Sequence, residues 1–218
     1  MAKKKSITSS DILTWYMDYV LEHNEKPKSV YAFSKANNFQ ESLFYNYFRS
    51  FDAIEKHIFK AFFDNSLEVL ENNTDYQSFD ARNKLLSFYY TFFENLTANR
   101  SYVVYALKGH EKSLKTLNYL SELKRVFNSY IGNLDIETID IKQEKFDKIQ
   151  QKALQESAWI QLLLTIKFWM DDTSAGFEKT DIFIEKSVNT SFDILNIAPL
   201  KSVIDLGKFL FKEKMHMN

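Results

Sequence analysis

Residues 29–54 read SVYAFSKANNFQESLFYNYFRSFDAI, and this stretch decides the fold. Two short amphipathic segments lie on either side of the pair Asn37-Asn38. An aromatic group follows and leads into Ser50-Phe51-Asp52; it consists of Phe44, Tyr45, Tyr47 and Phe48. This order predicts a helix, a tight turn, a second helix and the start of a longer helix.

Helical spacing extends this pattern to a small domain over residues 9–71, after a basic tail at 1–8 that we expect to be disordered. Its helices are predicted at Asp11–Glu22 with Ser9 or Ser10 as N-cap, at Val30–Ala36 with Ser29 as N-cap, at Gln40–Tyr47, and from Ser50 or Phe51 to Glu71. A polar break at 72–78 separates this domain from the rest of the chain.

Residues 72–218 are predicted to form a second, larger helical domain. Its helices are expected at 80–99, 102–107, 113–130, 143–170, 177–195 and 199–214, with a connector at 132–141. Pro199 suits the first turn of the last helix, because the first helical position needs no backbone N–H donor.

Composition supports an all-α protein. The 218 residues include only four Gly and two Pro, while 45% of the chain is apolar, which is ample for a sizeable core. The absence of Cys excludes disulfides and thiolate metal sites. The basic, polar N-terminus has no apolar region of a secretory signal, and no apolar run reaches spanning length, so we expect a cytoplasmic protein.

The stretch at 29–54 resembles the DNA-binding domain of TetR-type repressors. Ser29-Val30 matches the opening of the family's second helix, Phe44-Tyr45 and Tyr47-Phe48 match the aromatic end of its recognition helix, and Ser50 with Asp52 matches the next helix start. The resemblance implies a TetR-like fold, in which a three-helix helix-turn-helix domain precedes a helical bundle for ligand binding and dimerisation.

The same resemblance implies that double-stranded DNA is a partner. The DNA-contacting residues that it implies are Ser29, Gln40, Glu41, Ser42, Leu43, Tyr45 and Tyr47, with Lys3, Lys4 and Lys5 as an arm. Glu41 places a negative charge on the face that approaches DNA, and Phe51 stands where the family has a lysine. Residues 1–65 hold nine Lys or Arg against eight Asp or Glu, a weak balance for binding phosphates. Packing of the aromatic group within the domain is the alternative explanation of its pattern.

TetR-type repressors bind an apolar ligand in the second domain and dimerise through their last long helices. By resemblance, we expect a small apolar or lipid-like ligand and a homodimer. The residues predicted to line the ligand pocket are Tyr89, Tyr90, Phe93, Tyr105, Tyr119, Trp159 and Phe168. Ordinary core packing is the alternative for each of them.

A second resemblance covers residues 168–184, FWMDDTSAGFEKTDIFI. This segment looks like part of the lipid-binding accessory proteins of ubiquinone biosynthesis, which have a TetR-like fold, bind no DNA and meet a membrane through a terminal amphipathic helix. Helix-breaking and capping chemistry is the simpler explanation of the same pattern. The helix predicted at 199–214 has a wide apolar face that the core, a dimer partner or a lipid surface could cover.

The chain lacks the patterns of catalytic and metal sites. Its four histidines have no paired-ligand spacing, and neither a nucleophile elbow nor a phosphate-binding loop is present. We therefore expect no enzyme, no metal and no cofactor. The leading hypothesis is a TetR-type ligand-responsive DNA-binding regulator. The alternative is a lipid- or isoprenoid-binding accessory protein of the same fold that acts at a membrane surface.

Overall fold

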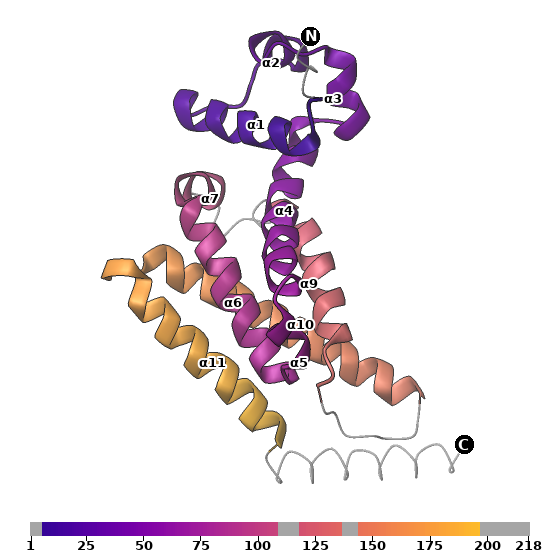
Figure 1. Cartoon of the computed structure of the whole chain (residues 1–218), viewed down its shortest axis with the longest axis vertical. Coiled ribbons are helices and arrows are strands. Elements are labelled where there is room, and N and C mark those ends of the chain that lie inside the picture. Colours follow the sequence, from indigo (N-terminus) through magenta and orange to yellow (C-terminus); the bar gives the residue numbers. More distant parts are fainter. Residues whose placement is uncertain (1–5, 109–117, 137–143, 197–218) are drawn as a thin grey trace, which may run out of the picture. The chain divides into compact units, whose positions relative to one another are not determined.

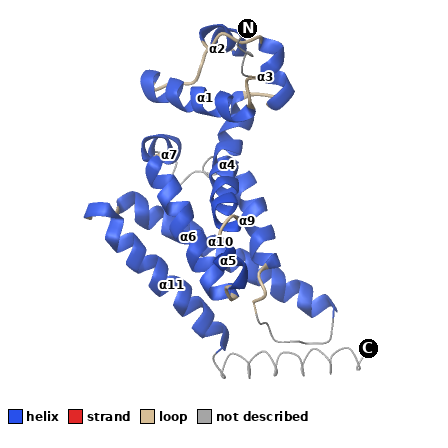
Figure 2. Cartoon of the chain, viewed as in Figure 1, coloured by secondary structure: helices blue, strands red, loops and turns tan. Residues whose placement is uncertain are grey.

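The computed structural model describes residues 6–108, 118–136 and 144–196, which are helical and contain no strand (Figure 1, Figure 2). The helices are α1 Ser9–His23, α2 Val30–Ala36, α3 Glu41–Tyr47, α4 Phe51–Glu71, α5 Thr74–Ser78, α6 Ala81–Ala98, α7 Arg100–Leu107, α9 Ser121–Asn133, α10 Glu144–Asp171 and α11 Glu178–Asn196, with a short 3-10 helix, η1, at Ala175–Phe177. The all-α prediction is confirmed.

The described residues form two compact units. Unit 1 takes those within 1–66 and 92–126, and unit 2 takes those within 67–91 and 127–218. Helices α4, α6 and α9 therefore contribute residues to both units. The division of the chain at 71/72 into two functional domains stays a prediction.

Local capping explains where the first helices of unit 1 begin and end. Thr8, not Ser9 or Ser10, is the N-cap of α1: its Oγ1 accepts from the Asp11 N–H at 3.2 Å, and the Asp11 carboxylate accepts from the Thr8 N–H at 2.7 Å. Asn24 ends α1 in the left-handed region, with φ of 55°. Ser29 caps α2 as predicted, accepting from the Ala32 N–H at 3.1 Å.

Unit 1 is built around large apolar side chains from its helices. Helix α1 packs against α7, and Figure 1 shows α1, α2 and α3 gathered around the start of α4. The fully buried side chains include Ile12, Tyr16, Val20, Phe33, Phe44, Ile54 and Tyr102. This core fixes the exposed face of α3.

Unit 2 has its own aromatic core and a row of polar contacts between α10 and α11. Phe127 joins Tyr89 and Trp159, with ring centroids 6.5 and 6.4 Å apart. Helices α10 and α11 pack against each other. Along their contact the Gln161 amide donates to Ser187 Oγ at 3.3 Å and accepts from Ser191 Oγ at 3.0 Å. These contacts fix the register of the pair.

Two segments differ from the sequence-based expectation. The polar break at 72–78 contains α5, because Tyr76 is buried and its hydroxyl lies 2.9 Å from that of Tyr130. Gly132 lies inside α9 and not in a connector, since that helix continues to Asn133. The helix predicted at 199–214 and the start of the one predicted at 113–130 lie outside the described residues. None of the described helices combines the length and apolar character needed to cross a bilayer.

Candidate functional site

The predicted recognition segment consists of two short helices and a tight turn within unit 1. After α2, Asn38 takes a left-handed φ of 56°, and the Phe39 N–H closes the turn by donating to the Ser34 carbonyl at 3.0 Å. Helix α3 begins at Glu41, one residue later than predicted, with Gln40 as its N-cap residue. An asparagine thus supplies the conformation for which glycine is the usual residue.

Three phenylalanines hold α3 in place. Phe33 of α2, Phe44 of α3 and Phe51 of α4 meet pairwise, with centroids 5.5 to 6.3 Å apart and rings nearly perpendicular. Phe51 also stacks on Tyr16 at 5.5 Å. Phe51, which stands where the resembling family has a lysine, therefore packs inside unit 1. Because Phe44 is fully buried, the opposite face of α3 must point outward.

The outward face of α3 carries most of the residues expected to touch DNA. Tyr45 and Tyr47 are 53% and 45% exposed. The Tyr45 hydroxyl donates to the Glu41 carboxylate at 3.4 Å, and the Tyr47 hydroxyl donates to the Ile7 carbonyl at 3.3 Å. Both phenol tips thus have internal partners while their rings face solvent. Ser29, Gln40 and Ser42 are exposed, whereas Glu41 and Leu43 are half-buried.

Positive charge near this face is sparse. Lys28, Lys35 and Arg49 are exposed in the described part of residues 1–50, and the Lys35 ammonium lies 6.0 Å from the Tyr31 ring centroid. Lys26 is held by two carboxylates, Asp52 at 2.9 Å and Glu55 at 2.8 Å. Lys3, Lys4 and Lys5 lie outside the described residues.

The seven residues predicted to line a ligand pocket fall in both units. In unit 2, Tyr89 and Trp159 are buried, Tyr90 is half-buried and Phe168 is at the surface. Burial alone raises the pKa of the Tyr89 hydroxyl. In unit 1, Phe93 is buried, whereas Tyr105 and Tyr119 are half-buried. Their lining role stays a prediction.

An open apolar groove lies between α10 and α11. Phe168 and Phe183 stack in parallel, with centroids 4.6 Å apart, at the junction of two cavities of about 550 and 420 Å³. Lys179 lines both cavities and Lys186 lines the larger one. Of the residues that line this groove, only Phe168 was predicted from the sequence as a lining residue. The apolar pair Ile182 and Phe183, on the side of α11 opposite its buried face, could have indicated the groove as well.

The segment at 168–184 owes its pattern to a capping network around Asp172. One carboxylate oxygen accepts from the N–H and hydroxyl of Ser174 at 2.8 and 2.7 Å; the other accepts from the N–H and hydroxyl of Thr180 at 2.9 and 2.7 Å. Burial opposes ionisation of Asp172, but these four hydrogen bonds outweigh it and lower its pKa well below the ordinary range. The network therefore ties the end of α10 to the first turn of α11.

Comparison with known families identifies the chain. Among the described residues, no group of three or more His, Asp or Glu side chains could hold a metal ion. No curated protein matches the chain. A family model described as "Tetracyclin repressor-like, C-terminal domain" matches residues 84–210, more than half of the sequence. That match and the helical architecture agree with the resemblance of residues 29–54. The chain belongs to the TetR family of regulators.

Proposed function

We propose that this regulator binds double-stranded DNA as a homodimer, responds to a small ligand and catalyses no reaction. The observation that carries the proposal is the geometry of α2 and α3: α3 buries Phe44 and turns Ser42, Tyr45 and Tyr47 outward. In a helix-turn-helix the second helix enters the major groove, and hydroxyl groups beside it hold phosphates. Tyr45 and Tyr47 are the phosphate-contacting residues in this proposal.

The electrostatics predict weak non-specific binding. Each phosphate neutralised by a lysine or arginine adds about 0.9 to the slope of log affinity against log salt. Of the exposed cations among the described residues up to 50, Lys26 is ion-paired with Asp52 and Glu55, which leaves Lys28, Lys35 and Arg49. The slope should therefore be shallow unless the arm of Lys3–Lys5 contributes. Glu41 can accept a hydrogen bond from cytosine once the Tyr45 hydroxyl leaves it for a phosphate.

An apolar stripe on α10 and α11 supports the homodimer. Ile160 and Leu164 of α10 and Ile182 of α11 are each at least half exposed, at 56, 54 and 50%. Together with Phe168 they form a surface that a second copy would cover. Leu164→Glu should therefore yield a monomer in sedimentation analysis, whereas Val69→Glu, an equally exposed position on α4, should stay dimeric.

The ligand proposed is a small apolar or lipid-like molecule bound by residues of the C-terminal region, with Tyr89, Tyr90, Phe93, Tyr105, Tyr119, Trp159 and Phe168 as the candidate lining. The aromatic character of these side chains suits such a molecule. Native mass spectrometry of the purified protein tests this point: co-purified lipid supports it, and a mass equal to that of the bare chain after expression in a lipid-rich host argues against it.

The lysine-edged apolar groove at Phe168 favours one alternative, an accessory protein that binds lipid or isoprenoid at a membrane surface. In that case the helix predicted at 199–214 would contact the bilayer. Flotation with anionic liposomes compares the full chain with a variant that ends at Ala198. Equal flotation of the two proteins removes the membrane contact through 199–214.

An anisotropy titration of a labelled random-sequence duplex at low salt tests DNA binding itself. Losing two phosphate contacts should weaken binding of Tyr45→Ala/Tyr47→Ala by about tenfold or more. Val69→Ala, at an exposed position of α4 within unit 2, serves as the control and should bind like the wild type. If the double variant binds as tightly as Val69→Ala, α3 does not contact DNA in the proposed way.

A further inference from the structure

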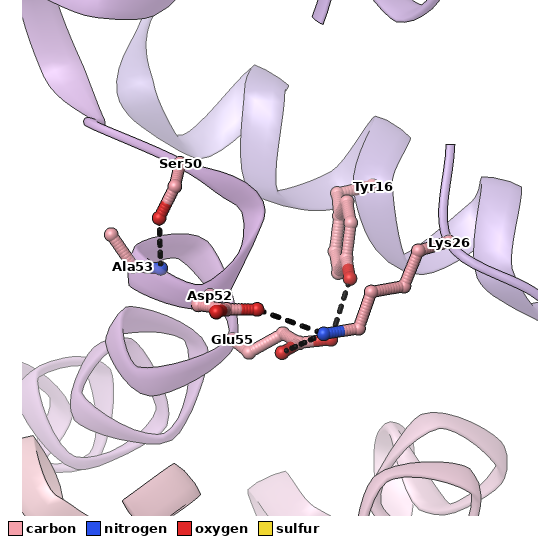
Figure 3. Close-up of polar contacts among 6 residues, drawn as sticks. All are labelled: Tyr16, Lys26, Ser50, Asp52, Ala53 and Glu55. Carbon is pink, nitrogen blue, oxygen red and sulfur yellow. Dashed lines mark hydrogen bonds and ion pairs between the residues drawn. The ribbon is translucent and has the colours of Figure 1, made fainter. Parts of the chain in front are cut away.

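Glu55 is a buried carboxylate of unit 1. It lies on α4 next to fully buried Ile54 and is only 4% exposed. A buried charge is tolerated where hydrogen-bond donors surround it. Here the Tyr16 hydroxyl donates to one carboxylate oxygen at 2.7 Å, and the Lys26 ammonium donates to the other at 2.8 Å (Figure 3). The two donors come from different segments of the chain.

Lys26 brings the connector between α1 and α2, residues 24–29, into contact with α4. The connector contains buried Pro27 and ends at Ser29, the N-cap of α2. Burial opposes the charge of Lys26, but hydrogen bonds to Glu55 and Asp52 outweigh it and raise its pKa. Asp52 is largely exposed, so solvent screens its contribution and the contact with Glu55 is the stronger one.

A third contributor, Tyr119, comes from residues 118–120, just before α9. The Lys26 ammonium lies 6.0 Å from the Tyr119 ring centroid, on the face of the ring. Burial and the charge of Glu55 raise the pKa of the Tyr119 hydroxyl; the charge of Lys26 opposes this rise, and a hydrogen bond to Glu55 adds to it. The four residues Tyr16, Lys26, Glu55 and Tyr119, called here the Glu55 cluster, thus join residues 9–66 to the region that the family model matches.

We propose that the Glu55 cluster couples the position of residues 118–120 to the conformation of the connector at 24–29, and through it to the orientation of α2. The Tyr119 ring covers one side of the Lys26 ammonium. When that ring moves away, water gains access to the ion pair and weakens it, because the attraction between charges falls with local polarity. The connector then loses the contact that holds it on α4.

The coupling is reciprocal by thermodynamic necessity. A ligand that displaces residues 118–120 would loosen the connector, and DNA that fixes the connector would hold Tyr119 in place. The consequence for DNA binding rests on the proposed function, whereas the coupling between Tyr119 and Lys26 does not. An experiment without DNA or ligand therefore tests the coupling independently of the proposed function.

Amide hydrogen exchange of the full-length protein tests the coupling. Tyr119→Ala should raise the amide exchange rate of the peptide that spans residues 25–33 by about fivefold. This is the effect expected when the cation–aromatic contact with Lys26 is lost and the ring no longer shields the ion pair from water. Tyr119→Phe keeps the ring and should give a smaller increase. Lys26→Met should reproduce the effect of Tyr119→Ala, and the double variant should exchange no faster than Lys26→Met alone.

Tyr90→Ala is the matched control, because it also truncates a half-buried tyrosine but lies on α6 in unit 2. Three results would overturn the coupling: faster exchange confined to residues 118–121, additive effects in the double variant, or the same increase at 25–33 in Tyr90→Ala. If the exchange effects are coupled but the protein does not bind DNA, the coupling through the Glu55 cluster stands and the proposed function is wrong. If the protein binds DNA but the exchange effects are not coupled, the proposed function stands and the coupling is wrong.

Discussion

Truncation of Phe44 should destabilise the protein far more than truncation of Tyr45, because Phe44 lies on the buried face of α3 and Tyr45 on its exposed face. Phe44 is fully buried and meets Phe33, Phe48 and Phe51 at centroid distances between 5.5 and 6.3 Å. Removing a buried Phe side chain costs about 3–5 kcal/mol, which includes the cavity left behind. Since a whole domain is stable by about 5–15 kcal/mol, Phe44→Ala should leave unit 1 marginal.

The neighbouring residue supplies the control. Tyr45 is 53% exposed, so Tyr45→Ala should change the free energy of unfolding by about 1 kcal/mol or less. Phe44→Leu keeps apolar volume and should fall between the two. Urea denaturation gives the free energies, and hydrogen exchange of the peptides from α2 and α3 shows where the loss occurs. If Phe44→Ala and Tyr45→Ala cost the same, the packing described for α3 is wrong.

Three further predictions concern helix ends. Ser29→Ala removes the N-cap bond of α2 and should cost about 1 kcal/mol by urea denaturation, while Ser42→Ala at an exposed position should cost less. Gly176 has φ of +61°, so Gly176→Ala should cost about 1–2 kcal/mol although the space beside it is open; no change would show that the turn can relax. The pKa of Asp172 is lowered in the folded state, so its contribution to stability is full above its ordinary pKa of 3.8 and is lost as the pH falls below that value. The acid unfolding curve of Asp172→Asn should therefore be flatter between about pH 4 and 2, and an unchanged slope would contradict the capping network.

The helices of residues 9–71 could be predicted because each level of the sequence agreed with the others. Apolar spacing, the Ser29 cap and the polar break after Glu71 all gave the same boundaries, and the structure places α2 and α4 where they were expected. The start of α1 was missed by two residues, Ser9 instead of Asp11, because Thr8, Ser9 and Ser10 are all good caps. Only the reciprocal bonds with Asp11 distinguish Thr8.

Long-range contacts could not be predicted in the same way. No local pattern distinguishes Glu55 from the other charged residues of α4, since its partners Tyr16 and Lys26 are 39 and 29 residues away. Phe51 looked like a lost phosphate contact, whereas its ring fills the space between α1, α2 and α3. Such pairings depend on tertiary packing, which local patterns do not encode.

Selection from a library of random duplex DNA with the full-length protein at low salt tests recognition by α2 and α3 most directly. A dimer with two recognition helices should enrich a pseudo-palindrome whose half-sites lie about 10 base pairs, or a multiple of that, apart. The enriched site should be bound far less tightly by Tyr45→Ala/Tyr47→Ala than by Val69→Ala. If selection enriches no motif, this TetR-family protein does not recognise DNA by sequence.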